Sequence, residues 1–161
     1  MAEEPSRPVI FTVGTGHRSL EELAALLSAA GVTRVADVRS YPKSHLPHFD
    51  RGELEGLLPA FGIDYAWLGA DLGGLRREGY QTYMGSERFR RGLALLEGLA
   101  RERPTALLCA ELDPTRCHRR WIAAALAETG WRVVNLGAPD AYPEQEPVQT
   151  ELRFGEEETT R

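Results

Sequence analysis

Both cysteines of the chain, Cys109 and Cys117, lie in one short segment with the sequence CAELDPTRCHRR. His118 directly follows the second cysteine, and an imidazolium or another cation beside a thiol favours the reactive thiolate. The segment therefore predicts a site for thiol chemistry, for anion binding, or for both. Its candidate catalytic residues are Cys109, Cys117 and His118, and its candidate anion-binding residues are Arg116 and Arg119.

The two thiols also have a purely structural interpretation. Cys109 ends an apolar run that is typical of a buried strand, and a free cysteine packs well as a small apolar side chain. Cys117 lies four residues before Trp121 and could extend the apolar stripe of a helix. The sequence leaves open whether either thiol reacts. Cysteine and histidine spacing matches no closed zinc motif, so we predict no metal and no other cofactor.

A second polar segment, DVRSYPKSHLPH, begins at Asp37 and ends at His48. Arg39 is its candidate anion-binding residue, with Asp37 as the acid that would hold the guanidinium in place. His45 is a supporting candidate in the same segment. The alternative interpretation is a solvated loop in which Asp37 pairs with Arg39 or with a backbone N–H group.

A third segment, GTGHRS, covers residues 14–19 and has the character of a turn between a strand and a helix. Such a glycine-rich turn can present backbone N–H groups to an anion, and Arg18 would add a cationic side chain. A dinucleotide-binding fingerprint requires a third glycine at position 19, where this chain has Ser19. We therefore expect no nicotinamide cofactor.

Three further residues are supporting candidates. Tyr80 and Tyr83 lie in the glycine-rich stretch 69–85, which we predict to be a long loop. Their rings could stack on a base, or they could anchor the loop to the core. Glu111 could neutralise the cations of the cysteine segment.

Apolar stretches typical of strands alternate along the chain with amphipathic stretches typical of helices. The predicted strands are residues 9–13, 34–38, 63–68, 105–110 and 131–136. This alternation predicts a single three-layer α/β domain with a mostly parallel five-stranded sheet and helices on both faces. The three polar segments follow the first, second and fourth strands, so they should meet at the carboxyl edge of the sheet.

Local signals define where the helices should begin. Ser19 and Glu22 have the spacing of a capping box, which predicts a helix that starts immediately after Ser19. Asp113 and Pro114 are suited to the N-cap and the first position of a later helix. The cysteine segment would then run from a strand end into a helix N-terminus, where the helix dipole favours an anion.

Composition narrows the class of protein. The chain has 161 residues, a net charge of −5, and 42% hydrophobic residues, which fits one globular domain and argues against coating of nucleic acid by charge alone. We expect a flexible segment at 1–8, a domain at 9–150 and an acidic, disordered tail at 151–161. The short apolar runs, the acidic N-terminus and two cysteines predict a cytoplasmic protein with no membrane partner and no disulfide.

Several of these motifs occur together, in order, between residues 9 and 137. They are Gly14 with Arg18-Ser19-Leu20-Glu21-Glu22, Asp37-Val38-Arg39-Ser40, Leu72-Gly73-Gly74, Tyr83-Met84, and Leu107-Leu108-Cys109-Ala110-Glu111 with Cys117-His118-Arg119. In this combination the chain resembles domain-of-unknown-function family 488. The resemblance implies an α/β domain and no established activity. The family usually has Gly-His-Ser at the first turn, where this chain has Gly14-Thr15-Gly16.

A looser resemblance is to rhodanese-like sulfurtransferases. Ala36-Asp37-Val38-Arg39 and His45-Leu46-Pro47 are similar to two of their segments, and this similarity would make Cys109 a carrier of a persulfide. Those enzymes have an arginine five residues after the cysteine, where this chain has Pro114.

Three hypotheses remain open from the sequence. The first is a cationic, cysteine-containing site that binds a phosphate-bearing ligand, either a nucleotide or a nucleic-acid end. The second is a thiol enzyme with Cys109 as the nucleophile. The third is a binding module in which both cysteines only pack. Whether the protein is an enzyme, and which proteins it contacts, is open.

Overall fold

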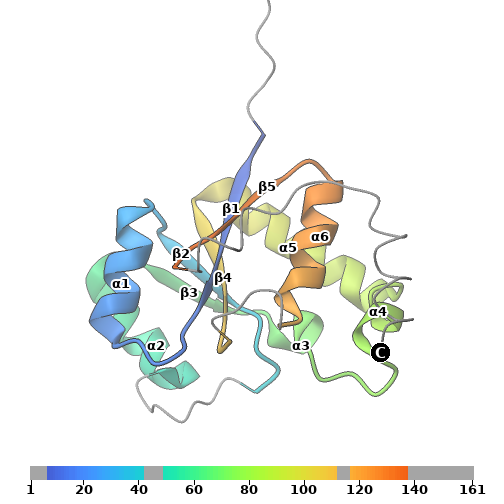
Figure 1. The fold of residues 1–161 in the computed structure, drawn as a ribbon, viewed down its shortest axis with the longest axis horizontal. Coiled ribbons are helices and arrows are strands. Elements are labelled where there is room, and N and C mark those ends of the chain that lie inside the picture. The colour runs from blue at the N-terminus through green and yellow to red at the C-terminus, as the bar shows by residue number, and fades with distance from the viewer. Residues whose placement is uncertain (1–6, 42–48, 112–116, 138–161) are drawn as a thin grey trace, which may run out of the picture.

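A computed structural model describes residues 7–41, 49–111 and 117–137, and all structural statements below concern these residues. Five strands form one parallel sheet in the order β3-β2-β4-β1-β5 (Figure 1). The strands are β1 Val9–Gly14, β2 Arg34–Asp37, β3 Asp64–Trp67, β4 Thr105–Cys109 and β5 Arg132–Asn135. The predicted fold class is confirmed, and the predicted strands differ from these by at most one residue at either end.

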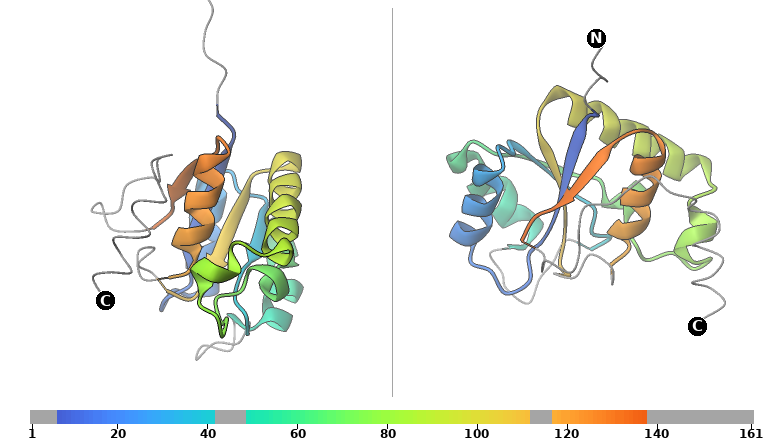
Figure 2. Two further views of the ribbon diagram at one scale, coloured as in Figure 1. Left: turned by 90° about the vertical axis from the view of Figure 1, so that its right-hand side faces the viewer. Right: turned by 45° about the horizontal axis from the view of Figure 1, so that its top comes forward.

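Helices cover both faces of the sheet (Figures 1 and 2). They are α1 Leu20–Ala29, α2 Arg51–Leu57, the 3₁₀ helix η2 Leu58–Phe61, α3 Gly69–Leu72, α4 Tyr80–Tyr83, α5 Glu87–Glu102 and α6 Arg119–Glu128. The chain moves across the sheet in one direction from β1 to β3 and returns from β3 to β5. Because such connections are right-handed, α1 and α2 lie on one face, and α5 and α6 lie on the other.

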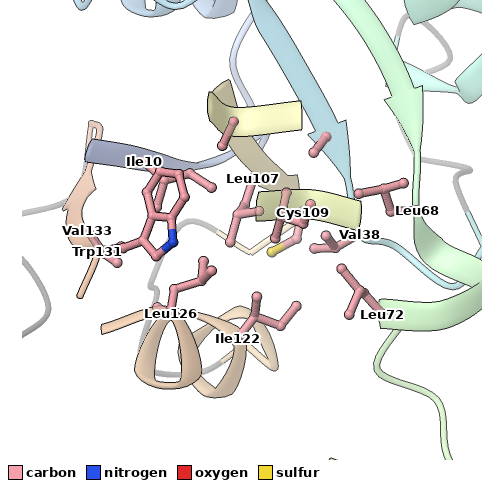
Figure 3. Close-up of a cluster of buried hydrophobic side chains, with 14 of the residues drawn as sticks. Ile10, Val38, Leu68, Leu72, Leu107, Cys109, Ile122, Leu126, Trp131 and Val133 are labelled. Carbon is pink, nitrogen blue, oxygen red and sulfur yellow. The ribbon is translucent and has the colours of Figure 1, made fainter. Parts of the chain in front are cut away.

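Each face of the sheet has its own hydrophobic cluster, because successive side chains of a strand point to opposite faces. In β4, Ala106 and Leu108 pack with α1 and α2, whereas Leu107 and Cys109 pack with α5 and α6. All five residues of β4 are buried, as a central strand covered on both faces requires. Figure 3 shows the side chain of Cys109 in the second cluster, near Ile122 of α6.

The sheet topology places a crevice beside Cys109. β2 and β4 are hydrogen-bonded neighbours, but the chain leaves β2 toward α2 on one face and leaves β4 toward α6 on the other. Connections that diverge in this way open a crevice at the carboxyl ends of the strands. β4 also pairs with β1, so the carboxyl ends of β2, β4 and β1 lie side by side at this edge of the sheet.

The capping box at the start of α1 is confirmed. The Ser19 hydroxyl accepts from the Glu22 backbone N–H at 3.0 Å, and the Glu22 carboxylate accepts from the Ser19 backbone N–H at 2.7 Å. Both side-chain oxygens thus accept from backbone N–H groups that have no partner within the helix.

The prediction that residues 69–85 form a loop is wrong in part, because this stretch contains α3 and α4. Leu72 and Tyr83 are buried in the cluster shared with α5, and this packing stabilises two helices of only four residues each. The glycines indicated turns in this stretch, but they did not indicate the tertiary contacts that stabilise α3 and α4.

The start of α6 also differs from the prediction. The helix begins at Arg119, and His118 occupies the N-cap position. The proposed start at Asp113-Pro114 lies outside the described residues, as do His45, Arg116 and the acidic tail. None of the described helices is both long and apolar enough to cross a membrane.

Candidate functional site

A pocket of about 430 Å³ lies at the carboxyl ends of β2 and β4. It is lined by residues that follow β2 and α3, by the last residue of β4 and the two residues after it, and by the two residues before α6. The lining residues are Arg39, Ser40, Tyr41, Gly74, Leu75, Cys109, Ala110, Glu111, Cys117 and His118. The crevice predicted from the strand order therefore contains both cysteines, the histidine and one of the predicted anion-binding arginines.

The two thiols are in direct contact, with their Sγ atoms 2.6 Å apart, and neither is in a disulfide. Cys109 is 2% exposed and belongs to the hydrophobic cluster under α6, where Figure 3 shows it beside Val38. Cys117 is partly exposed and packs against the same cluster from the pocket side. The pair therefore has an inner thiol and an outer thiol, and a solute in the pocket meets Cys117 more readily.

His118 is held in a defined orientation beside Cys117. Its Nε2 lies 2.9 Å from the carbonyl oxygen of Val38, and because a carbonyl only accepts, Nε2 must carry a proton. Nδ1 then faces the Cys117 Sγ at 3.8 Å. Tyr80 packs edge-on against the imidazole, with ring centroids 5.3 Å apart. This arrangement allows Nδ1 to take the thiol proton and to stabilise the resulting thiolate.

The environment lowers the pKa of the Cys117 thiol to about 4. The main cause is the hydrogen bond from Cys109, which stabilises the thiolate, while burial opposes the shift. His118 lowers the pKa further, and so does the backbone N–H of Arg119, which lies 3.5 Å from Sγ at the start of α6. These are the groups expected around a reactive thiol.

The pKa of Cys109 shifts in the opposite direction. Its hydrogen bond to Cys117 raises its pKa, and burial and the nearby Cys117 charge raise it further. A proton shared between two contacting thiols leaves the charge on the thiol with the better donors around it, which is Cys117. The geometry therefore favours Cys117 over Cys109 as the nucleophile, in contrast to the second hypothesis drawn from the sequence.

Arg39 forms the cationic wall of the pocket. Its Nε and Nη2 donate to the two carboxylate oxygens of Asp37 at 2.9 and 2.7 Å, and Nη2 also donates to the Phe49 carbonyl. The Tyr65 hydroxyl donates to the same carboxylate. Arg39 is only 6% exposed, yet its Nη1 has no hydrogen-bond partner among the described residues. This guanidinium nitrogen therefore keeps an unused N–H donor, although burial without a partner is costly for such a group.

Arg119 lies close to the thiols without lining the pocket. It is 1% exposed, and its positive charge acts on Cys109, whose pKa it lowers by a smaller amount than the opposing causes raise it. Its backbone N–H donates to the Sγ of Cys117. The side chain of Arg119 is not among the residues that line the pocket, so its predicted role as an anion ligand stays a prediction.

Arg18 does not join the pocket, contrary to the expected convergence of arginines. It lines a separate hollow with His17 and Glu22, and it donates to the carbonyl oxygens of Gly14 and Gly137 at 3.0 and 3.2 Å. Arg18 therefore contacts the chain at the ends of β1 and β5, and β4 separates these two strands from β2.

The turn after β1, which was expected to bind an anion, uses two of its backbone N–H groups within the protein. The backbone N–H groups of Thr15 and Gly16 donate to the carbonyl oxygens of Cys109 and Ala110 at 2.8 and 3.0 Å. The turn therefore holds the end of β4 in place and so positions Cys109, and these two N–H groups are not available to a ligand.

Tyr80 and Tyr83 anchor their segment, which was one of the two interpretations left open. Their hydroxyl groups donate to the carbonyl oxygens of Leu72 and Asp71 at 2.8 and 2.6 Å. Arg76 lies over the Tyr83 ring at 3.8 Å. Burial, the largest cause, raises the pKa of both phenols. Glu111, exposed at the rim of the pocket, has a carbonyl oxygen 3.8 Å from the Cys109 Sγ.

Sequence reasoning missed the role of Gly73 and Gly74, of which Gly74 lines the pocket. A Cβ atom on Gly74 would lie 2.7 Å from Nδ1 of His118, and one on Gly73 would lie 2.1 Å from the Ser40 hydroxyl oxygen. The same hydroxyl accepts from the Leu75 backbone N–H at 3.1 Å. The adjacent glycines were a visible signal of close backbone approach, but the sequence alone does not identify what they approach.

Comparisons with known proteins give one family. A sequence model of the family described as "Domain of unknown function DUF488" matches residues 19–126, which span the strands and helices that build the pocket. Neither the curated proteins nor the solved structures include a match. Within the described residues, no group of three or more histidine, cysteine or acidic side chains is arranged to hold a metal ion.

Proposed function

The chain belongs to the DUF488 family, which is defined by a domain of unknown function, and we propose from the geometry of its pocket that it is a thiol enzyme with Cys117 as nucleophile. The observation that carries this proposal is the position of the Cys117 sulfur between Cys109 Sγ at 2.6 Å and His118 Nδ1 at 3.8 Å, at the wall of an open pocket. With the backbone N–H of Arg119 at 3.5 Å, three activating groups surround one accessible sulfur, which is more than packing requires.

The roles follow from the contacts. The Cys117 thiolate attacks an electrophilic atom of the substrate, and a bond to sulfur forms as the bond to the leaving group breaks. The imidazolium of His118, held by Val38, returns its Nδ1 proton to the leaving group. Cys109 stabilises the thiolate by hydrogen bonding, so it is a positioning residue in this step.

Alkylation with iodoacetamide tests the proposal directly. We expect Cys117 to be labelled rapidly at neutral pH in the folded protein, with no label at Cys109, as read by peptide mass spectrometry. Cys117→Ser removes the fast label, whereas Cys109→Ser retains a label at Cys117. Labelling of both thiols only after unfolding would contradict the proposal and would favour the hypothesis that both cysteines only pack.

We also propose that the same pocket takes a phosphate-bearing ligand, either a nucleotide or a nucleic-acid end. Two observations support this proposal: Arg39 lines the pocket that holds Cys117, and its buried Nη1 is a donor without a partner among the described residues. The carboxylate of Asp37 fixes the guanidinium plane, so Nη1 is oriented before the ligand arrives.

Calorimetric titration of phosphate, AMP and a short oligonucleotide tests this ligand class. Arg39→Lys keeps the charge beside Asp37 but removes the fork, so we expect weaker binding than in the wild type. Arg18→Ala is the matched control, because Arg18 lines a different hollow, and we expect it to leave binding unchanged. Arg119 is unsuitable for this test, because a side chain that is 1% exposed is part of the folded core.

A second measurement needs no variant. A ligand held by Arg39 shields the neighbouring Cys117, so phosphate or AMP should slow iodoacetamide labelling of the wild-type protein. No heat of binding and no protection by any of the three probes would refute the phosphate ligand. Rapid labelling of Cys117 in the same experiment would leave the thiol enzyme standing.

A further inference from the structure

The contact between the two sulfur atoms has a second chemical consequence. These are the only cysteines in the chain, they are eight residues apart, and the fold brings their Sγ atoms to 2.6 Å. A disulfide requires Sγ atoms about 2.05 Å apart, so only a small movement separates the dithiol from the bonded form. Stabilising a thiolate by a hydrogen bond does not by itself require a second cysteine, since a hydroxyl would also donate.

The surroundings of the two thiols are unequal in the way a redox pair requires. Cys117 is partly exposed at the pocket, whereas Cys109 is 2% exposed among apolar side chains such as Val38 and Ile122. A dissolved oxidant therefore reaches Cys117 first. Cys109 then has one accessible reaction partner, which is the sulfur of Cys117.

We propose that Cys117 is a site of reversible oxidation by hydroperoxides and that Cys109 resolves the oxidised residue into an intramolecular disulfide. The inference rests on the proposed reactivity of Cys117 and adds a modification to it. The disulfide removes the nucleophile, so oxidation switches the proposed enzyme off, and reduction by a dithiol restores it.

Oxidation to the disulfide proceeds in two steps. The Cys117 thiolate attacks one oxygen of the hydroperoxide, an S–O bond forms, the O–O bond breaks, and the alkoxide leaves with the proton of the His118 imidazolium as an alcohol. The sulfur of Cys109 then attacks the sulfur of the sulfenic acid. An S–S bond forms, the S–O bond breaks, and the hydroxide leaves with the Cys109 proton as water. The thiols lose two electrons, and the hydroperoxide gains them.

The experiment treats reduced protein with one equivalent of hydrogen peroxide in the presence of dimedone, which traps sulfenic acids, followed by N-ethylmaleimide and intact-mass measurement. We expect the wild type to lose the mass of two hydrogen atoms, to gain neither reagent, and to recover fully with dithiothreitol. Cys109→Ser should gain dimedone at Cys117, because nothing resolves its sulfenic acid. Cys117→Ser should gain no dimedone, since the remaining thiol is buried.

The outcomes separate this inference from the proposed function. Wild-type protein that gains dimedone, or that is oxidised to the sulfinic acid without forming a disulfide, overturns the resolving role of Cys109. Rapid iodoacetamide labelling of Cys117 would still support the thiol enzyme in that case. Wild-type protein that resists both peroxide and iodoacetamide overturns both proposals, and this result needs no variant to fold.

Discussion

His118 donates from Nε2 to the carbonyl oxygen of Val38 over 2.9 Å, and this bond ties the start of α6 to the chain that leaves β2. It determines which ring nitrogen faces the thiol, because a proton on Nε2 directs Nδ1 toward Cys117. The reactivity of the sulfur therefore depends on a contact between two segments that are eighty residues apart in the sequence.

Replacing His118 with Phe should slow alkylation of Cys117. The variant keeps a ring of similar shape but removes Nδ1, so the pKa of the thiol rises. Below that new pKa, the thiolate fraction falls about tenfold for each unit of the rise. The measurement is the iodoacetamide rate at pH 6. His17→Phe is the control, since His17 is exposed in a separate hollow, and equal rates in both variants would contradict the role of His118.

The labelling rate of the wild type should depend weakly on pH near neutrality. Cys117 is an acid whose pKa is lowered to about 4, so it is a thiolate above that pH and a thiol below it. We expect a plateau from about pH 5 to 8, since an ordinary cysteine would instead gain about tenfold per unit up to roughly pH 8.5. Cys109→Ala should shift the midpoint upward, because it removes the hydrogen bond that is the main cause of the lowered pKa of Cys117. A steep rise through neutral pH in the wild type would refute the assignment.

Gly74→Ala should disturb the site without unfolding the domain. Its Cβ would lie 2.7 Å from Nδ1 and 2.8 Å from Cγ of His118, so the imidazole must move. We expect the displaced ring to raise the pKa of the Cys117 thiol and so to slow the labelling of Cys117 by iodoacetamide. The matched control is Gly52→Ala in α2, where a Cβ meets nothing within 4 Å and should stabilise the helix by about 0.5–1 kcal/mol. Unchanged labelling in the Gly74 variant would show that the ring tolerates the displacement.

Asp37→Asn should destabilise the fold strongly. Asp37 is fully buried and pairs with Arg39, so its loss leaves a buried guanidinium without a counter-charge. We expect a loss of roughly 3–5 kcal/mol in the free energy of unfolding, measured with urea. Glu55→Gln is the control, because Glu55 and Arg51 form a half-exposed i,i+4 pair and should contribute only about 0.3–0.5 kcal/mol. If both variants lost equally little free energy of unfolding, Arg39 would have another counter-charge and the prediction would be wrong.

Much of the fold could be predicted because its signals are local. Alternating apolar and amphipathic stretches indicate strands and helices, and a capping box such as that of Ser19 marks a helix start within four residues. Parallel strands then require crossovers, which brings the segments after β2 and β4 to one edge. The positions of Arg39 beside Asp37, and of both cysteines near the sheet edge, follow from these rules alone.

The remaining features depend on contacts between distant segments. The sequence determined that two thiols, a histidine and several arginines gather near the carboxyl edge of a parallel sheet, because chain order and periodicity set the strands and the segments that follow them. Only the tertiary structure decided that the pKa of Cys117 is lowered and that of Cys109 raised, that Arg39 lines the pocket while Arg18 does not, and that Tyr80 packs on His118. The physical reason is that a pKa and a side-chain direction depend on burial and on hydrogen-bond partners, which the sequence does not contain.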